Sequence, residues 1–279
     1  MRRFSTSFAR LSIAAAIVAC ASAKTLQQPP PGDFHITGDP ESAKGATWTF
    51  TGTVDGVEYD MTGILLKPAG RGPFPAVVIS HGGQGSAEFY GGAIAPTMRD
   101  WGLVCIAPNY TFSAGVPIGR PGDSSEVGAS RNNVLRAHMT RELLRRLGYV
   151  DMSRVALHGN SMGAFLDAAL AGAYPGDFRA ASATGGGVRP DDADELMVPS
   201  VSQVRAIRTP YQIHHGGADA NVPLDLDTRF DSLLTTLGVR HELDVYPGVT
   251  HAGMRLDSLM LRRVREWYLN EGVLSDGRR

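Results

Sequence analysis

One segment, Arg154-Val-Ala-Leu-His-Gly-Asn-Ser-Met-Gly-Ala-Phe165, shows most directly how this 279-residue chain folds. Val155 to Leu157 is a short apolar run of the kind that forms a buried strand, and good helix formers follow Ser161. Ser161 therefore lies at a turn from a strand into a helix. Gly159 and Gly163 let such a turn bend sharply and pack closely against its neighbours, which leaves the serine hydroxyl exposed at the end of the sheet.

On both sides of this segment, short apolar runs alternate with helical patterns, which predicts one α/β domain with a mostly parallel central sheet flanked by helices. The expected strands are 76–80, 102–107, 178–184, 210–215 and 242–246, and the expected helices are 135–147, 226–237 and 257–270. Asp55-Gly56 lies between the strand-like runs 47–51 and 57–66, which predicts an antiparallel hairpin at the start. The excursion after residue 184 is short, so we expect a minimal cap domain, or none, and an open site.

Composition limits the function classes. The formal net charge is −1 and the sequence has no long charge runs, so nothing indicates a nucleic-acid surface, and a small or uncharged substrate is the default. Of the two cysteines, Cys105 lies in an apolar strand-like run and is expected to be a buried hydrophobe. Oligomeric state stays open.

The first residues predict an export signal over 1–23, followed by a Pro- and Gln-rich spacer over 24–44 and the α/β domain over 45–279. Arg2-Arg3 and a short apolar run, Leu11 to Ala19, are typical of such a signal, and a twin-arginine signal is one version of it. Two processing sites remain open. Cleavage after 21–23 would release a periplasmic or secreted protein, and lipidation of Cys20 would anchor it to a membrane. In neither case can Cys20 form an intramolecular disulfide.

A second glycine-rich loop, His81-Gly82-Gly83-Gln84-Gly85, directly follows the strand at 76–80. Glycines allow the backbone to turn its N–H groups toward a ligand, as an oxyanion hole requires. The N–H of Met162, at the helix start, is the expected first donor, and the N–H of Gly83, or of Gln84, is the second. His81 is expected to brace this loop by hydrogen bonding.

The candidate acid and base lie beyond the last two strands of the sheet. Asp219 follows the strand at 210–215 and can reach a histidine ring, although Asp225 and Asp244 remain alternatives. His251 lies in the loop after the final strand, where a general base for Ser161 must be placed.

No metal site is predicted. His214 and His215 are adjacent in a strand and point to opposite faces, and the acidic cluster 191–195 has no histidine nearby. Tyr110 and Phe112, in the irregular loop 109–128, either line a substrate pocket or pack against the domain.

The order Ser161, Asp219, His251 on alternating strands and helices is that of the α/β-hydrolase triad. With the two glycine-rich loops, it makes the chain from about residue 45 onward resemble α/β hydrolases, nearest the dienelactone-hydrolase-like and prolyl-oligopeptidase-like branches. The resemblance implies that Ser161 is the nucleophile, His251 the base and Asp219 its orienting acid. True dienelactone hydrolases have cysteine where this chain has Ser161, so their particular substrate is not implied.

The resulting expectation is an exported serine esterase that acts on small-molecule esters through an acyl-enzyme and needs no metal or organic cofactor. A peptidase or amidase of the prolyl-oligopeptidase-like branch is the first alternative, although we expect no propeller domain in these 279 residues. A catalytically inactive hydrolase fold that serves as a binding module is the second.

Overall fold

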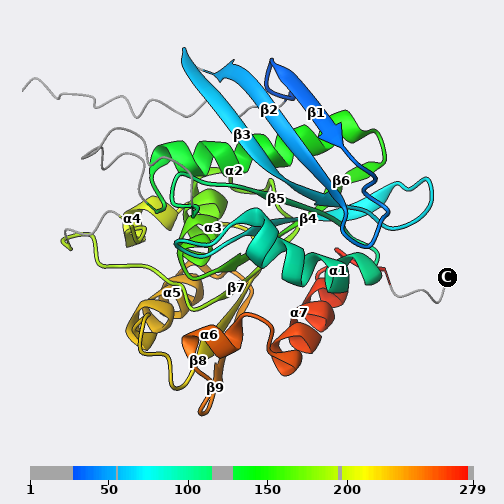
Figure 1. Cartoon of the computed structure of the whole chain (residues 1–279). Coiled ribbons are helices and arrows are strands. Elements are labelled where there is room, and N and C mark those ends of the chain that lie inside the picture. Colours follow the sequence, from blue (N-terminus) through cyan, green and yellow to red (C-terminus); the bar gives the residue numbers. More distant parts are fainter. Residues whose placement is uncertain (1–27, 55, 115–127, 194–196, 276–279) are drawn as a thin grey trace, which may run out of the picture.

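The computed structural model describes residues 28–54, 56–114, 128–193 and 197–275. Within them the chain forms a nine-stranded sheet in the order β1-β2-β3-β5-β4-β6-β7-β8-β9 (Figure 1). The strands are β1 (Asp33–Thr37), β2 (Ala46–Val54), β3 (Val57–Leu66), β4 (Phe74–Ser80), β5 (Val104–Pro108), β6 (Val150–Asn160), β7 (Ala180–Thr184), β8 (Tyr211–Gly216) and β9 (His241–Tyr246). Along this order, each pair of neighbouring strands from β5 to β9 is parallel. The pairs β1-β2, β2-β3 and β3-β5 are antiparallel. This is the α/β-hydrolase architecture that the sequence predicts.

Helices cover both faces of the sheet. One core forms against α2 (Arg131–Leu143), α3 (Met162–Ala173) and α5 (Leu224–Leu237), and the other against α1 (Gly92–Asp100), α6 (His251–Met254) and α7 (Ser258–Asn270). A π-helical turn η1 (Ala87–Gly91), a 3-10 turn η3 (Leu144–Leu147) and a one-turn helix α4 (Val201–Val204) complete the described helices. None of the helices in the described ranges is both long and apolar enough to cross a membrane.

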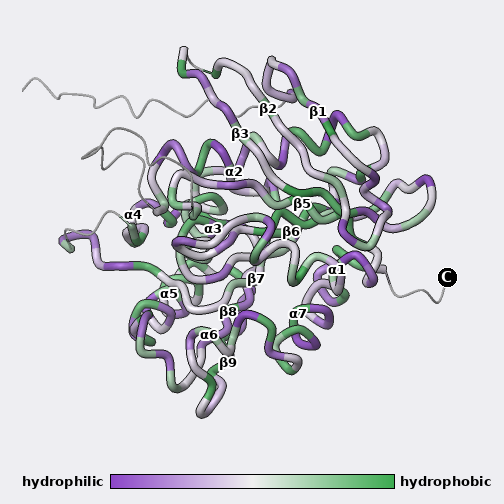
Figure 2. The backbone as a smooth tube through the Cα atoms, in the orientation of Figure 1, coloured by the Kyte–Doolittle hydropathy of each residue, from purple (hydrophilic) through white to green (hydrophobic). Residues whose placement is uncertain are grey.

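The side-chain alternation of a strand explains why the central strands are apolar throughout. In β4, Ala76 and Val78 pack into the first core, while Val77 and Ile79 pack into the second. Figure 2 shows hydrophobic residues concentrated along these central strands, whereas the outer helices α1 and α7 also carry hydrophilic ones. Because the central strands are packed on both faces, the loops at their ends start from fixed positions.

The antiparallel start of the sheet differs from prediction in one respect. The hairpin of β2 and β3 forms as predicted, with Val54 opposite Val57. However, β1 lies inside the segment 24–44 that was predicted to be a spacer. The ring of Phe34 in β1 lies 5.9 Å from that of Trp48, and the backbone of β1 pairs along β2. Strand pairing and the packing of the partly buried Phe34 ring therefore order this segment. The prediction of a spacer over 24–44 is therefore wrong for residues 33–37.

The predicted helix over 135–147 is also divided. α2 ends at Leu143 and continues as the 3-10 turn η3, and Gly148 terminates the helix in the left-handed conformation at φ 71°. The predicted export signal lies outside the described residues.

Candidate active site

Ser161 lies at the sharp turn between β6 and α3. Its backbone has φ 56° and ψ −118°, a strained conformation for a residue with a side chain. The N–H of Ser161 donates to the carbonyl oxygen of Thr184 at 2.8 Å, which ties the turn to the end of β7. A Cβ on Gly159 would meet the Gly163 carbonyl oxygen at 2.5 Å, so the backbone can close this turn only with glycine.

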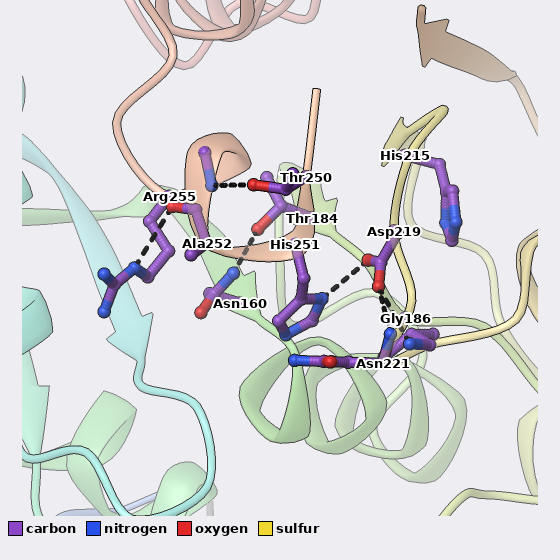
Figure 3. A network of polar contacts seen from close by, with 12 residues as sticks. Asn160, Thr184, Gly186, His215, Asp219, Asn221, Thr250, His251, Ala252 and Arg255 are labelled. Atoms are coloured by element: carbon purple, nitrogen blue, oxygen red, sulfur yellow. Dashed lines mark hydrogen bonds and ion pairs between the residues drawn. The ribbon is translucent and has the colours of Figure 1, made fainter. Parts of the chain in front are cut away.

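His251 begins α6, in the loop beyond β9, and its ring faces Asp219 (Figure 3). The Nδ1 atom of His251 lies 2.6 Å from Oδ2 of Asp219. The Asp219 side chain is fully buried, and its Oδ1 accepts the backbone N–H groups of Asn221 and Val222 at 2.8 and 2.9 Å. Burial alone would raise the pKa of Asp219, but the hydrogen bonds from Val222, His251 and Asn221 bring it below its ordinary value. The carboxylate is thus held ionised beside His251.

The two other candidate acids lie in different environments. The Asp225 side chain is 67% exposed and lies 3.8 Å from the Arg229 guanidinium. Asp244 forms an ion pair of 2.6 Å with Arg263. Asp219 therefore carries the geometry that a histidine-orienting acid requires.

Ser161 and His251 line the same open cavity of about 300 Å³. The rest of its lining is Gly82, Gly83, Gln84, Gly85, Phe89, Tyr90, Asn160, Asn221, Ala252 and Arg255. Among the residues that the structure describes, no hydrogen bond joins the Ser161 hydroxyl to the His251 ring. Such a contact commonly tightens only when substrate binds, so this geometry is consistent with a free hydrolase.

The glycine-rich loop after β4 lies against the Ser161 turn. The Gln84 N–H donates to the carbonyl oxygen of Phe112 at 3.0 Å, so this group is already engaged. Gly83 lies beside Met162, since a Cβ on Gly83 would be 3.9 Å from the Met162 Cβ. Of the two predicted alternatives, the geometry favours Gly83 as the second oxyanion donor, with Met162 at the N-terminus of α3 as the first.

His81 braces this loop, as the sequence predicts. Its Nδ1 donates to the Gly82 carbonyl oxygen at 2.8 Å, and its Nε2 lies 2.6 Å from the Ser113 hydroxyl. Burial lowers the pKa of His81 to about 4, so the ring is neutral near pH 7.

Of the two alternatives for Tyr110 and Phe112, the structure supports packing against the domain, and the pocket-lining alternative is wrong for the described cavity. Tyr110 is buried, and its hydroxyl lies 3.0 Å from that of Ser80. Phe112 stacks on Tyr110 with ring centroids 5.1 Å apart and packs against the main core. Neither residue lines the described cavity beside Ser161, because the apolar interior competes for both aromatic rings. Part of their loop, 115–127, lies outside the described residues.

Several lining residues were not predicted from the sequence. Phe89 and Tyr90 reach the cavity through the π-helical turn η1, which has no clear sequence signal. Arg255 lies four residues after His251, one helical turn away, and that spacing was a usable signal for a second lining side chain.

His214 and His215 point apart, as predicted. His214 Nδ1 lies 2.8 Å from the Tyr246 hydroxyl, and His215 Nδ1 lies 2.7 Å from Asp227 Oδ2. A separate cluster of metal-ligand types, His138, Glu142 and Asp177, lies at α2 and the turn after α3. Arg141 and Arg145 pair with Glu142, and these cations oppose the binding of a metal ion there. Cys105 is buried, as expected for a small hydrophobe.

Comparison with known proteins identifies the family and supports the fold. A family model described as the dienelactone hydrolase family matches residues 61–258. Among curated proteins, the human acylamino-acid-releasing enzyme is 27% identical over an alignment of 236 residues, and the match covers 71% of this chain. The match spans about a third of that relative, 32% of its length.

Among solved structures, the chain is similar in fold to a thermophilic esterase from the Planctomycetes species Thermogutta terrifontis. The butyrate-bound form is 21% identical with a TM-score of 0.61, covering 80% of this chain and 92% of that one. The form phosphorylated by paraoxon is 20% identical with a TM-score of 0.64, covering 89% and 97%. At this identity the likeness supports the fold assignment.

Proposed function

This chain belongs to the dienelactone hydrolase family, and we propose that within this family of hydrolases it is a serine esterase that forms an acyl-enzyme on Ser161. One observation carries the proposal. Ser161, on a strained strand-to-helix turn, shares a cavity with His251, whose ring is held 2.6 Å from a buried carboxylate. That arrangement suits nucleophilic attack on a carbonyl carbon.

In the acylation step, His251 acts as the base. Because its Nδ1–H points to Asp219, the lone pair of Nε2 is left to accept the proton of the Ser161 hydroxyl. The Ser161 oxygen then bonds to the ester carbonyl carbon. The negative oxygen of the tetrahedral intermediate is stabilised by the N–H groups of Met162 and Gly83, each such donor being worth about 3 kcal/mol of barrier.

Collapse of the intermediate breaks the bond to the alcohol oxygen, which leaves with the proton from His251. A water molecule then attacks the acyl-enzyme, His251 accepts its proton, and a second collapse releases the carboxylic acid and regenerates the Ser161 hydroxyl. Asp219 stabilises the charged ring in both halves of the reaction.

Cleavage of amide bonds is the second candidate function. It is supported by the 27% identity to the acylamino-acid-releasing enzyme, whose name describes release of acylated amino acids. The same residues serve amide cleavage, since an amine replaces the alcohol as leaving group. An inactive fold that binds ligands is a third reading, which the presence of Ser161, Asp219 and His251 together disfavours.

The test is hydrolysis of a chain-length series of p-nitrophenyl esters, with matched anilides, by the wild type and by Ser161→Ala, together with fluorophosphonate labelling. We expect labelling at Ser161, ester turnover above anilide turnover, and loss of turnover in the variant. Preferential anilide turnover would support the amidase instead. No labelling and no turnover of either series would support a binding module.

We also propose that the protein is exported, on the strength of the basic and apolar residues in 1–23. Mass spectrometry of the mature N-terminus distinguishes the two forms. A start at Lys24 indicates a soluble exported protein, a lipidated Cys20 indicates a membrane anchor, and an intact Met1 contradicts export.

A further inference from the structure

A second hollow adjoins the cavity at Ser161, and the reaction chemistry above does not use it. This groove of about 230 Å³ shares Phe89, Tyr90, Ala252 and Arg255 with the cavity. It then continues over Ala93 and Leu256. Ser161 and the two oxyanion donors lie outside its lining, so the groove is an arm of the active site and not its reacting centre.

The walls of the groove carry unusually exposed apolar side chains. Phe89 is 62% exposed and Leu256 is 49% exposed. The Phe89 ring is held in place from one side, because the Arg255 guanidinium lies 5.1 Å from its centroid. An apolar surface that is exposed, supported and continuous with a catalytic cavity is typical of a ligand subsite.

The position of the groove relative to His251 indicates which part of a substrate it receives. Ala252 and Arg255 line the groove and also line the cavity together with His251, and Ala252 is the next residue after His251, so the shared wall lies beside the helix that carries the imidazole. His251 must pass its proton to the leaving oxygen, which places the alcohol portion of an ester on that side. The acyl portion stays bonded to Ser161, which lines the first cavity and not the groove.

We propose that this groove is a leaving-group subsite that selects esters of apolar alcohols. The inference rests on the proposed esterase function and adds its substrate class. Since the alcohol departs during acylation, the subsite acts on kcat/KM and has no effect on hydrolysis of the acyl-enzyme.

The test uses two ester series. In the first, acetates of ethanol, butanol, hexanol and 2-phenylethanol share one acyl group. In the second, p-nitrophenyl esters share one alcohol and vary in acyl length. The variants are Phe89→Ser and Leu256→Ser. The matched control is Leu259→Ser, because Leu259 is the same residue type at 40% exposure on the neighbouring α7 and lines neither hollow.

In the wild type we expect kcat/KM on the acetates to rise about threefold for each methylene group buried. Each of Phe89→Ser and Leu256→Ser removes one wall of the groove and about half of this rise in free-energy terms, so hexyl acetate loses about tenfold relative to ethyl acetate. The acyl-length preference and the deacylation rate constant stay unchanged in Leu256→Ser, because Leu256 lines the groove and not the cavity at Ser161. The Leu259→Ser control matches the wild type. A filling variant, Ala93→Phe, lowers kcat/KM for 2-phenylethyl acetate and spares ethyl acetate.

Three outcomes overturn the subsite. These are a flat alcohol series in an active wild type, equal losses in the Leu259→Ser control, and a change in acyl preference in place of alcohol preference. The failure of the esterase proposal itself differs from all three, because Ser161 would then remain unlabelled and neither ester series would turn over.

Discussion

The glycine two residues after Ser161 shows how closely the elements meet at the turn. A Cβ on Gly163 would lie 2.2 Å from the Ser80 carbonyl oxygen, so α3 rests directly on the end of β4. This contact brings the turn and the oxyanion loop together, because Ser80 is followed by His81 and Gly82. The identity of one residue therefore sets the spacing between the nucleophile and its oxyanion donors.

We predict that Gly163→Ala forces α3 away from β4 and lowers the free energy of unfolding by about 2 kcal/mol. It should also slow fluorophosphonate labelling of Ser161. Gly92→Ala is the control, since that position has φ −60° and nothing within 4 Å of an added Cβ. Chemical denaturation compares the two variants, and equal stability would show that the helix can shift without cost.

The second prediction at the residue scale concerns the acid. Asp219→Asn should lower kcat by about 10³ to 10⁴-fold, because the amide favours the wrong tautomer of His251. Asp225→Asn, at an exposed position in the first turn of α5, should retain wild-type activity. Steady-state kinetics on one ester suffices, and near-normal turnover of Asp219→Asn would assign the acid to another carboxylate.

At the scale of elements, a second histidine-aspartate pair joins β8 to α5. His215 Nδ1 lies 2.7 Å from Asp227 Oδ2, both side chains are almost fully buried, and the same carboxylate oxygen accepts the Gly186 N–H at 3.2 Å. Burial alone would lower the pKa of His215, but the hydrogen bond from its ring to Asp227 and the charges of Asp227 and Asp219 raise it. Figure 3 shows His215 on the side of Asp219 away from His251.

This pair predicts a pH-dependent stability. Because the pKa of His215 is raised on folding, its contribution is fully present below about pH 6.5, the unfolded value, and is lost as pH rises through the folded pKa. Asp227→Asn should therefore cost about 3 kcal/mol at pH 6 and less at pH 9. Thermal unfolding is measured at both pH values. Lower pH is avoided because burial also raises the pKa of Asp227, and protonation of this carboxylate would remove the ion pair. A cost that is the same at both pH values would contradict a charged His215.

The elements themselves were largely predictable from their apolar patterns. Val155 to Leu157 and 76–80 form strands because a run buried on both faces has no polar positions, and the stripe from Leu135 to Leu147 forms the helix that continues as η3. The π-helical turn at Phe89 was not predicted, since its geometry follows from packing of Tyr90 and Ala87 against the core.

At the scale of the whole molecule, β1 extends the sheet at the edge far from the active site, with β2, β3 and β5 between it and β4. Arg146 donates to the carbonyl oxygen of Gly32 at 2.8 Å, and Lys67 N–H donates to that of Pro40 at 2.9 Å. These contacts attach the segment before residue 45 to the body of the domain.

We therefore predict that a chain beginning at Gly45 is less stable than one beginning at Gln28 by about 3 kcal/mol, chiefly through loss of the Phe34 contact with Trp48. Ester turnover at 20 °C should stay within about twofold, since the active site lies across the sheet. Calorimetry of the two chains gives the difference. Equal melting temperatures would mean that β1 adds no stability and that 24–44 behaves as a spacer.

The amino-acid sequence was sufficient for the sheet from β2 to β9, for the strand-to-helix turn at Ser161, and for the order of Ser161, Asp219 and His251. Burial periodicity and glycine positions act locally along the chain, so the sequence alone shows them. It left three candidate acids for His251, two candidate donors for the oxyanion, and two possible positions for Tyr110 and Phe112, in the pocket or in the core. Those choices depend on which side chains from distant segments reach one another, as Asp219 and His251 do across 32 residues. Likewise, Tyr110 enters the core and Phe89 lines the cavity, and neither position is decided until β5 and η1 pack together.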